Sequence, residues 1–143
     1  DALENWTEQG KMTKEMAACI RPEEILKFLE SSCGRRMKQA AGNRRLYREQ
    51  PFVLGIEAGE VYHQEQEGEL LLVQGIIDVW FEEEDGLVVL DYKTDQVDSP
   101  EELTEKYHAQ LDYYARALEQ LTGKKVKEKI IYSFTLKQEI RLP

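Results

Sequence analysis

The chain has 143 residues, which suits one domain with a hydrophobic core and is short for two. It carries 19 basic and 28 acidic residues, a net charge of −9, and this balance argues against attraction to nucleic acid by net charge alone. No stretch approaches the roughly 18 apolar residues of a membrane span, and the polar start lacks signal-peptide character. We therefore expect a soluble, cytoplasmic protein, in which Cys19 and Cys33, too few for a zinc site, are reduced packing residues.

Residues 1–43 are predicted as short helices. Pro22 opens one of them with an acidic first turn, and Gly34 is expected to separate it from a basic helix that ends near Gly42. The stretch from Arg35 to Arg48, which includes this basic helix, has no acidic residue, and two interpretations of it are open: an exposed helix end or a surface that faces phosphates. The apolar stripe of the first helix comprises Ile25, Leu26, Phe28 and Leu29, and the basic run comprises Arg35, Arg36, Lys38, Arg44, Arg45 and Arg48.

Three strands are predicted next. Residues 44–56 favour a strand in which Pro51 takes an edge position or a bulge, and the polar residues 55–68 favour a loop. Residues 70–81 and 87–94 are two further strand-like runs, joined by an acidic stretch, residues 82–85, that is typical of a solvated turn. Asp85 and Gly86 in this link are a strong hairpin signal.

The clearest helix runs from Ser99 to Gly123. Ser99 is the expected N-cap, Pro100 the first helical residue, Glu102 the capping-box acid and Gly123 the C-cap. Strands are predicted over residues 129–135 and 139–142, so the fold class is α/β, with a mixed central sheet flanked by helices. The buried stripe of the long helix comprises Leu103, Tyr107, Gln110 or Leu111, Tyr114, Leu118 and Leu121.

The hairpin brings three polar residues to one face of the sheet. If Asp85 and Gly86 form a two-residue turn, Asp78 lies opposite Lys93, and Trp80 lies opposite Asp91. A four-residue loop would set Asp78 opposite Asp91 and keep the shared face, whereas an odd-length loop without a bulge would destroy it. The other face is then apolar, with Ile77, Val79, Phe81, Val88, Leu90 and Tyr92.

Two carboxylates and an ammonium within roughly 5–8 Å on a buried sheet require compensation. One interpretation is a structural Asp–Lys ion pair. The other is a site for Mg²⁺, in which the cation would acidify an attacking water and Lys93 would neutralise the charge that develops on a phosphodiester.

These residues carry a resemblance. Asp78, at the end of Gly-Ile-Ile-Asp, precedes the Asp-Tyr-Lys-Thr-Asp segment at residues 91–95 by thirteen residues, and this pattern resembles the motif of the PD-(D/E)XK nucleases in the form found in AddA and RecB helicase–nucleases. Gln110 and Tyr114 are similar to the Q-x-x-x-Y motif of the RecB-like branch, and residues 48–52 resemble its R-E-x-P-F strand. The resemblance covers about residues 30–143 and implies a restriction-endonuclease-like core over residues 44–143, in a single nuclease domain with a helical segment at residues 1–43.

The resemblance also implies roles for single residues. Asp78, Asp91 and the backbone carbonyl of Tyr92 would bind Mg²⁺, for which Mn²⁺ is an expected substitute, and Lys93 would be the catalytic lysine. Gln110 and Tyr114 would lie near the DNA strand on one helix face. Two acids stand apart from this set: Glu49, either an additional acid or an ordinary surface or ion-pair residue, and Asp95, which we leave outside the ligands.

The implied function is that of a Mg²⁺-dependent DNA exonuclease domain of an AddA-type helicase–nuclease that processes double-strand breaks. ATP would bind only the parent helicase region, which would feed single-stranded DNA to the domain, and an AddB-type subunit would be the partner. Related nucleases carry an upstream histidine in a G-T-x-x-H context, which neither His63 nor His108 provides; we therefore expect an excised C-terminal domain, weakly active or inactive alone. The alternatives are a noncatalytic nuclease-like module that binds DNA or partner subunits, and a standalone RecB-like or Cas4-like exonuclease.

Overall fold

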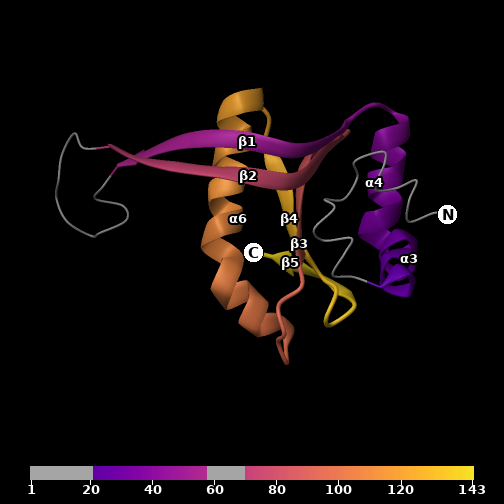
Figure 1. Cartoon of the computed structure of the whole chain (residues 1–143). Helices are drawn as coiled ribbons and strands as arrows, with labels where there is room; N and C mark the ends of the chain where they lie inside the picture. Colours follow the sequence, from indigo (N-terminus) through magenta and orange to yellow (C-terminus); the bar gives the residue numbers. More distant parts are fainter. Residues whose placement is uncertain (1–20, 58–69) are drawn as a thin grey trace.

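A computed structural model describes residues 21–57 and 70–143 of the chain (Figure 1). The helices predicted before residue 21, most of the predicted polar loop, Cys19 and His63 lie outside these ranges. In the described ranges, no helix is long and apolar enough to cross a membrane. The helices and strands are α3 (Pro22–Glu30), α4 (Ser32–Gly42), β1 (Leu46–Glu57), β2 (Leu70–Glu83), β3 (Gly86–Lys93), α6 (Pro100–Thr122), β4 (Val126–Ser133) and β5 (Gln138–Leu142).

The strands form one mixed sheet in the order β1-β2-β3-β4-β5. Among the described strands, only β3 and β4 pair in parallel, and α6 is the crossover that connects them. Figure 1 shows α3 and α4 on one side of the sheet and α6 on the other. The predicted fold class is therefore confirmed, although β4 begins three residues earlier than the strand that we expected from residue 129.

Each face of the sheet packs on its own helices, because alternate residues of β3 point to opposite faces. Val88, Leu90 and Tyr92 pack with α3 and α4, whereas Leu87 and Val89 pack with α6. Cys33 of α4 is buried as a free thiol, as we predicted, and burial raises its pKa to about 12.

Ser31, and not Gly34, separates α3 from α4. The hydroxyl oxygen of Ser31 accepts a hydrogen bond from the Gly34 amide at 3.2 Å, which caps the start of α4. Gly34 lies buried inside the first turn, where a Cβ atom would clash with the carbonyl oxygen of Phe28. Gly34 thus allows α3 and α4 to approach each other closely. The prediction that a helix ends at this residue is wrong. On α3, Phe28 is buried as predicted, but Leu26 is 48% exposed.

Strand β1 lies at the edge of the sheet; compared with the strand predicted over residues 44–56, it begins two residues later and ends one residue later. Pro51 therefore occupies an edge strand, as predicted. Pairing continues as far as Glu57 opposite Leu70, so the residues from Gly55 to Glu57 that we assigned to a loop are in β1.

The hairpin of β2 and β3 has an even register, but its turn lies one residue earlier than predicted. Glu83 pairs with Gly86, which leaves Glu84 and Asp85 as the turn. Gly86 belongs to β3 with φ of +153°, a conformation that favours glycine. The same register, continued, sets Asp78 opposite Asp91 and not opposite Lys93, which is the arrangement that we derived for a four-residue loop.

The alternation of β2 shifts by one residue at Asp78. Ile77 packs on the α6 side, Val79 on the α3 and α4 side, and Trp80 on the α6 side again. Glu49, which faces this point from β1, has φ of +49°, so both strands are irregular here. The prediction that Ile77 shares a face with Val79 is wrong for this reason.

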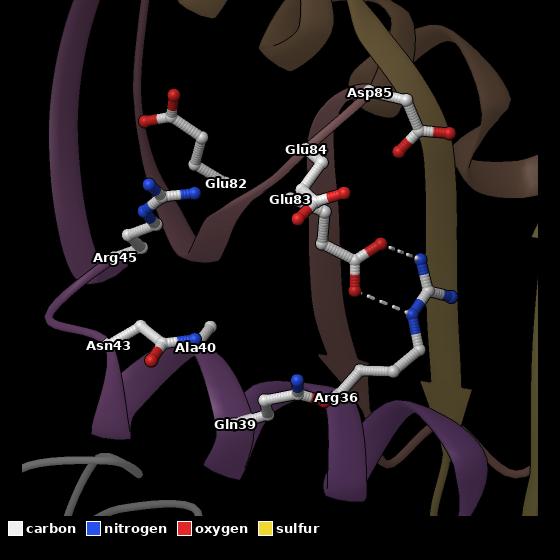
Figure 2. A pocket seen from close by; sticks show the side chains of 9 residues that line it. All are labelled: Arg36, Gln39, Ala40, Asn43, Arg45, Glu82, Glu83, Glu84 and Asp85. Atoms are coloured by element: carbon white, nitrogen blue, oxygen red, sulfur yellow. Dashed lines mark hydrogen bonds and ion pairs between the residues drawn. The ribbon is translucent and has the colours of Figure 1, made fainter.

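A charged cluster joins α4 to the turn of the hairpin. Arg36 donates from Nε and Nη2 to Glu83 at 3.0 and 2.8 Å (Figure 2) and also pairs with Glu128. Lys127 lies 2.8 Å from Glu83 and also pairs with Asp85. Arg36, Glu83 and Asp85 border a cavity of about 570 Å³. The acidic run is thus ion-paired and not simply a solvated turn, and Arg36 of the basic run takes part in this pairing.

The ion pair with Arg36 holds the pKa of Glu83 at about 2, below its ordinary 4.5. A lowered carboxyl pKa stabilises the fold above the ordinary value and loses that effect as the pH falls towards the lowered one. We expect Glu83→Gln to reduce the free energy of unfolding at pH 7 by on the order of 1 kcal/mol. Urea unfolding at pH 7 and pH 3 should show this deficit shrinking in acid. Glu84→Gln, at an exposed position of the same turn, is the control, and a deficit independent of pH would contradict the assignment.

Candidate active site

The predicted acids and lysine lie together on the sheet face that α6 covers. Asp91 is 2% exposed, and its Oδ2 atom lies 2.8 Å from the Nζ atom of Lys93. The amide of Tyr92 donates a hydrogen bond to Oδ2 of Asp78 at 3.1 Å. The structure therefore brings Asp78, Asp91 and Lys93 to one site, at the point where β2 loses its regular alternation.

Burial and the neighbouring Asp91 disfavour the charged form of the Asp78 carboxyl group. Burial raises the pKa of Asp78 well above its ordinary range, and the neighbouring Asp91 raises it further. The Tyr92 amide and Lys93 act in the opposite direction and do not cancel the effect. The charged form of Asp78 is therefore unfavourable in the absence of a positive charge, and a bound cation would supply that charge.

The donor set fits a hard divalent cation. Oδ2 of Asp91 is buried and has no hydrogen-bond partner in the described part of the chain; its contact with Lys93 is an ion pair without hydrogen-bond geometry. The described residues contain no group of three or more His, Cys, Asp and Glu side chains that could hold a metal ion. Two carboxylates are a small set, of the kind that suits Mg²⁺, because this cation keeps several of its waters; the contribution of the Tyr92 carbonyl stays a prediction.

Lys93 is held by two residues of α6. Its Nζ atom donates to Oε1 of Gln110 at 3.1 Å and lies 3.9 Å from the centroid of the Tyr107 ring. The Tyr107 hydroxyl donates in turn to Oδ2 of Asp95 at 2.7 Å. The sequence pattern placed Tyr107 only on the buried stripe; its position three residues before Gln110, on the same helix face, is the signal that could have identified it. Asp95 also pairs with Lys106 and does not join the acids.

Tyr114 is buried beside the site. Its ring packs edge to face on Phe52 of β1, with centroids 5.4 Å apart. Burial raises the pKa of its hydroxyl, and the charges of Asp91 and Asp78 raise it further. Tyr114 therefore connects α6, β1 and the acids, while the predicted contact of Gln110 and Tyr114 with DNA stays a prediction.

The predictions for the ends and the buried stripe of α6 are confirmed only in part. Helix α6 begins at Pro100 after Ser99, but the Ser99 side chain makes no capping hydrogen bond. Gly123 ends the helix with φ of +72°, as predicted. Leu121 is 62% exposed and is not in the buried stripe, which includes Ala117 instead.

Two remaining candidates lie away from the acid pair. Glu49 is exposed on β1, and the structure does not bring it into a metal-binding group with Asp78 and Asp91. His108 of α6 lines a separate cavity of about 490 Å³ with Asp112 and Lys129.

A mixed sheet that presents two acids and a lysine between flanking helices is the arrangement that the resemblance to nucleases implied. The family model of the PD-(D/E)XK nuclease superfamily matches residues 2–141. The chain belongs to this superfamily, as its motifs indicated.

Similar proteins include long helicase–nucleases. The chain is 42% identical to the A subunit of the ATP-dependent helicase/nuclease of Clostridium novyi, over 98% of this chain and 12% of that protein. It is 45% identical to the corresponding protein of Clostridium kluyveri over 87% of the chain and 10% of that protein. For the Lachnoclostridium phytofermentans protein of the same name the identity is 40%, over 94% of the chain and 12% of the relative. The chain thus spans about a tenth of the length of these relatives.

Proposed function

We propose that the chain is the nuclease domain of an AddA-type helicase–nuclease and that it hydrolyses phosphodiester bonds of DNA with Mg²⁺ as its cofactor. The observation that carries this proposal is the convergence of Asp78, Asp91 and Lys93 on one buried face, with Oδ2 of Asp91 lacking a hydrogen-bond partner. Membership of a nuclease superfamily and the names of the similar proteins support it.

Asp78, Asp91 and the Tyr92 carbonyl would hold the cation, and Mn²⁺ is expected to substitute for Mg²⁺. A divalent cation at such a site supplies positive charge that polarises the phosphate and lowers the pKa of water. The chain contributes the rest: Lys93, held by Gln110 and the ring of Tyr107, is placed to offset the negative charge that grows on the phosphate oxygens in the transition state. The surrounding apolar cluster keeps these interactions in a low dielectric.

The proposal extends to the larger protein. A helicase region that binds ATP would feed single-stranded DNA to this domain, so that tethering, and not the net charge of −9, would bring the substrate close. We propose exonucleolytic digestion at double-strand breaks in the cytoplasm, with a partner of the AddB type. In this arrangement residues 44–143 form the core and residues 1–43 a helical segment of one C-terminal domain.

The full-length polypeptide that carries this chain should digest a labelled single-stranded oligonucleotide in the presence of Mg²⁺. We expect EDTA to abolish cleavage and excess Mg²⁺ or Mn²⁺ to restore it, because the acids require a cation to act on phosphate. Gel analysis of the labelled products measures both the loss and the recovery of cleavage. The controls are buffers free of zinc and reactions that contain the cation without the polypeptide. Digestion that persists in EDTA, or that no divalent cation supports, would overturn the proposal.

A further inference from the structure

Tyr47 and Trp80 form a parallel aromatic stack at the edge of the sheet. They are cross-strand partners on β1 and β2, and their ring centroids lie 4.2 Å apart with planes 16° from parallel. Trp80 is 5% exposed, whereas Tyr47 is 41% exposed. One face of the Tyr47 ring is therefore covered by a buried partner that fixes its plane, and its exposed surface lies away from Trp80.

The stack lies next to the acid pair on the same face of the sheet. Trp80 packs on the α6 side, the side to which Asp91 and Lys93 also point. Asp78 precedes Trp80 by two residues on β2, a separation of about 7 Å along a strand. Because Tyr47 is the cross-strand partner of Trp80, its ring is displaced from the acids by about the same distance along the strand. This distance is comparable to the spacing of neighbouring nucleotides in an extended strand.

The surroundings of Tyr47 suit an anionic chain. Strand β1 is at the end of the strand order, so a ligand can approach from its outer side without displacing a described strand. Three exposed arginines, Arg44, Arg45 and Arg48, lie within three residues of Tyr47 in the sequence, and Arg48, the next residue of β1, points to the opposite face of the sheet. Exposed aromatic rings beside cationic side chains are the usual means of binding single-stranded nucleic acid, since every base has a π face.

We propose that the Tyr47 ring is a stacking platform for one nucleobase of single-stranded DNA. The adjoining nucleotide then places its phosphate at Asp78 and Asp91; this placement rests on the proposed nuclease function, whereas the stacking does not. Because Trp80 holds the ring in place, stacking costs little ordering of the side chain. The contact is independent of base identity, as a nuclease that digests arbitrary sequence requires.

The test is the affinity of the full chain for fluorescein-labelled oligothymidine, measured by anisotropy in EDTA so that no cleavage occurs. We expect Tyr47→Ala to weaken binding by about 5- to 150-fold and Tyr47→Trp to keep it within about threefold of the parent chain. Tyr47→Val, which retains strand propensity but has no π face, should match the alanine variant and covers the case in which alanine disturbs the fold. Val53→Ala, an exposed position farther along β1, is the matched control and should bind as the parent does.

A strand of abasic sugar–phosphate units separates stacking from charge. The preference of the parent chain for oligothymidine over the abasic strand should largely disappear in Tyr47→Ala and Tyr47→Val. Equal losses for both strands, unchanged affinity in the two variants, or no measurable binding by the parent chain would each overturn the proposal. Because the assay contains no metal, failure of the nuclease proposal would appear separately, as absent cleavage with Mg²⁺ alongside intact Tyr47-dependent binding.

Discussion

Replacing Lys93 with methionine, or Asp91 with asparagine, is expected to lower DNA cleavage by the full-length polypeptide at least about 10³-fold. Each substitution preserves side-chain volume and removes a charge. Lys93→Met removes the ammonium that Gln110 and Tyr107 hold beside the acids, and Asp91→Asn removes the carboxylate whose Oδ2 atom lacks a hydrogen-bond partner. Initial rates of digestion of a labelled single strand in saturating Mg²⁺ measure the effect, and the corresponding alanine variants should lose activity to the same degree.

Two matched controls distinguish this loss from a general effect of charge. Lys125→Met and Asp98→Asn remove the same charges at exposed positions of the same chain and should digest DNA at the parental rate. Far-UV circular dichroism should be unchanged in all four variants, because each substitution preserves side-chain volume and alters none of the apolar residues that form the two clusters. Undiminished digestion by either site variant would remove that residue from the proposed chemistry.

The sequence was sufficient to group Asp78, Asp91 and Lys93 on one face of the sheet because its signals are local. The turn residues and the two-residue period of strands fix which side chains share a face. An error of one residue in the position of the turn shifted the register by two, and this changed the partner of Asp78 from Lys93 to Asp91 without changing its face. The predicted face of each side chain was therefore correct although the predicted position of the turn was not. The acids and the lysine could be grouped before any tertiary contact was known.

Features that depend on contacts distant in sequence could not be predicted in this way. The change in side-chain alternation at Asp78 involves Glu49, an irregular residue on another strand. For this reason Ile77 lies on the α6 side of the sheet and not on the predicted side. Gly34 resembled a helix breaker in the sequence. Its actual constraint is the carbonyl oxygen of Phe28 on the neighbouring helix, a contact that no local pattern indicates. The pairing of Arg36 with Glu83 and Glu128 likewise joins segments that no periodicity connects.

Asp78→Asn is expected to have opposite effects on the stability of the chain without and with a divalent cation. Without a cation, the amide oxygen can still accept the hydrogen bond from the Tyr92 amide, and the side chain no longer sets a second acid beside Asp91. A raised carboxyl pKa means that the native chain retains a proton that the unfolded chain releases above its ordinary 3.8, so the wild-type carboxyl lowers stability as the pH rises from about 4. The variant should therefore unfold at a higher temperature in EDTA at pH 7.5.

With Mg²⁺ or Mn²⁺ the order should reverse, because binding to the native state alone stabilises by RT ln(1 + [L]/Kd) and the variant has lost a ligand. Calorimetric titration of the full chain should show cation affinity reduced more than about 100-fold by Asp78→Asn, with Asp98→Asn unchanged. A structural Asp–Lys ion pair predicts a different pattern, in which cations raise the unfolding temperature of neither the parent nor the variant. Retention of parental affinity by the variant would instead place the cation elsewhere, since a buried carboxylate that ligates a small hard cation cannot be replaced by a neutral amide without cost.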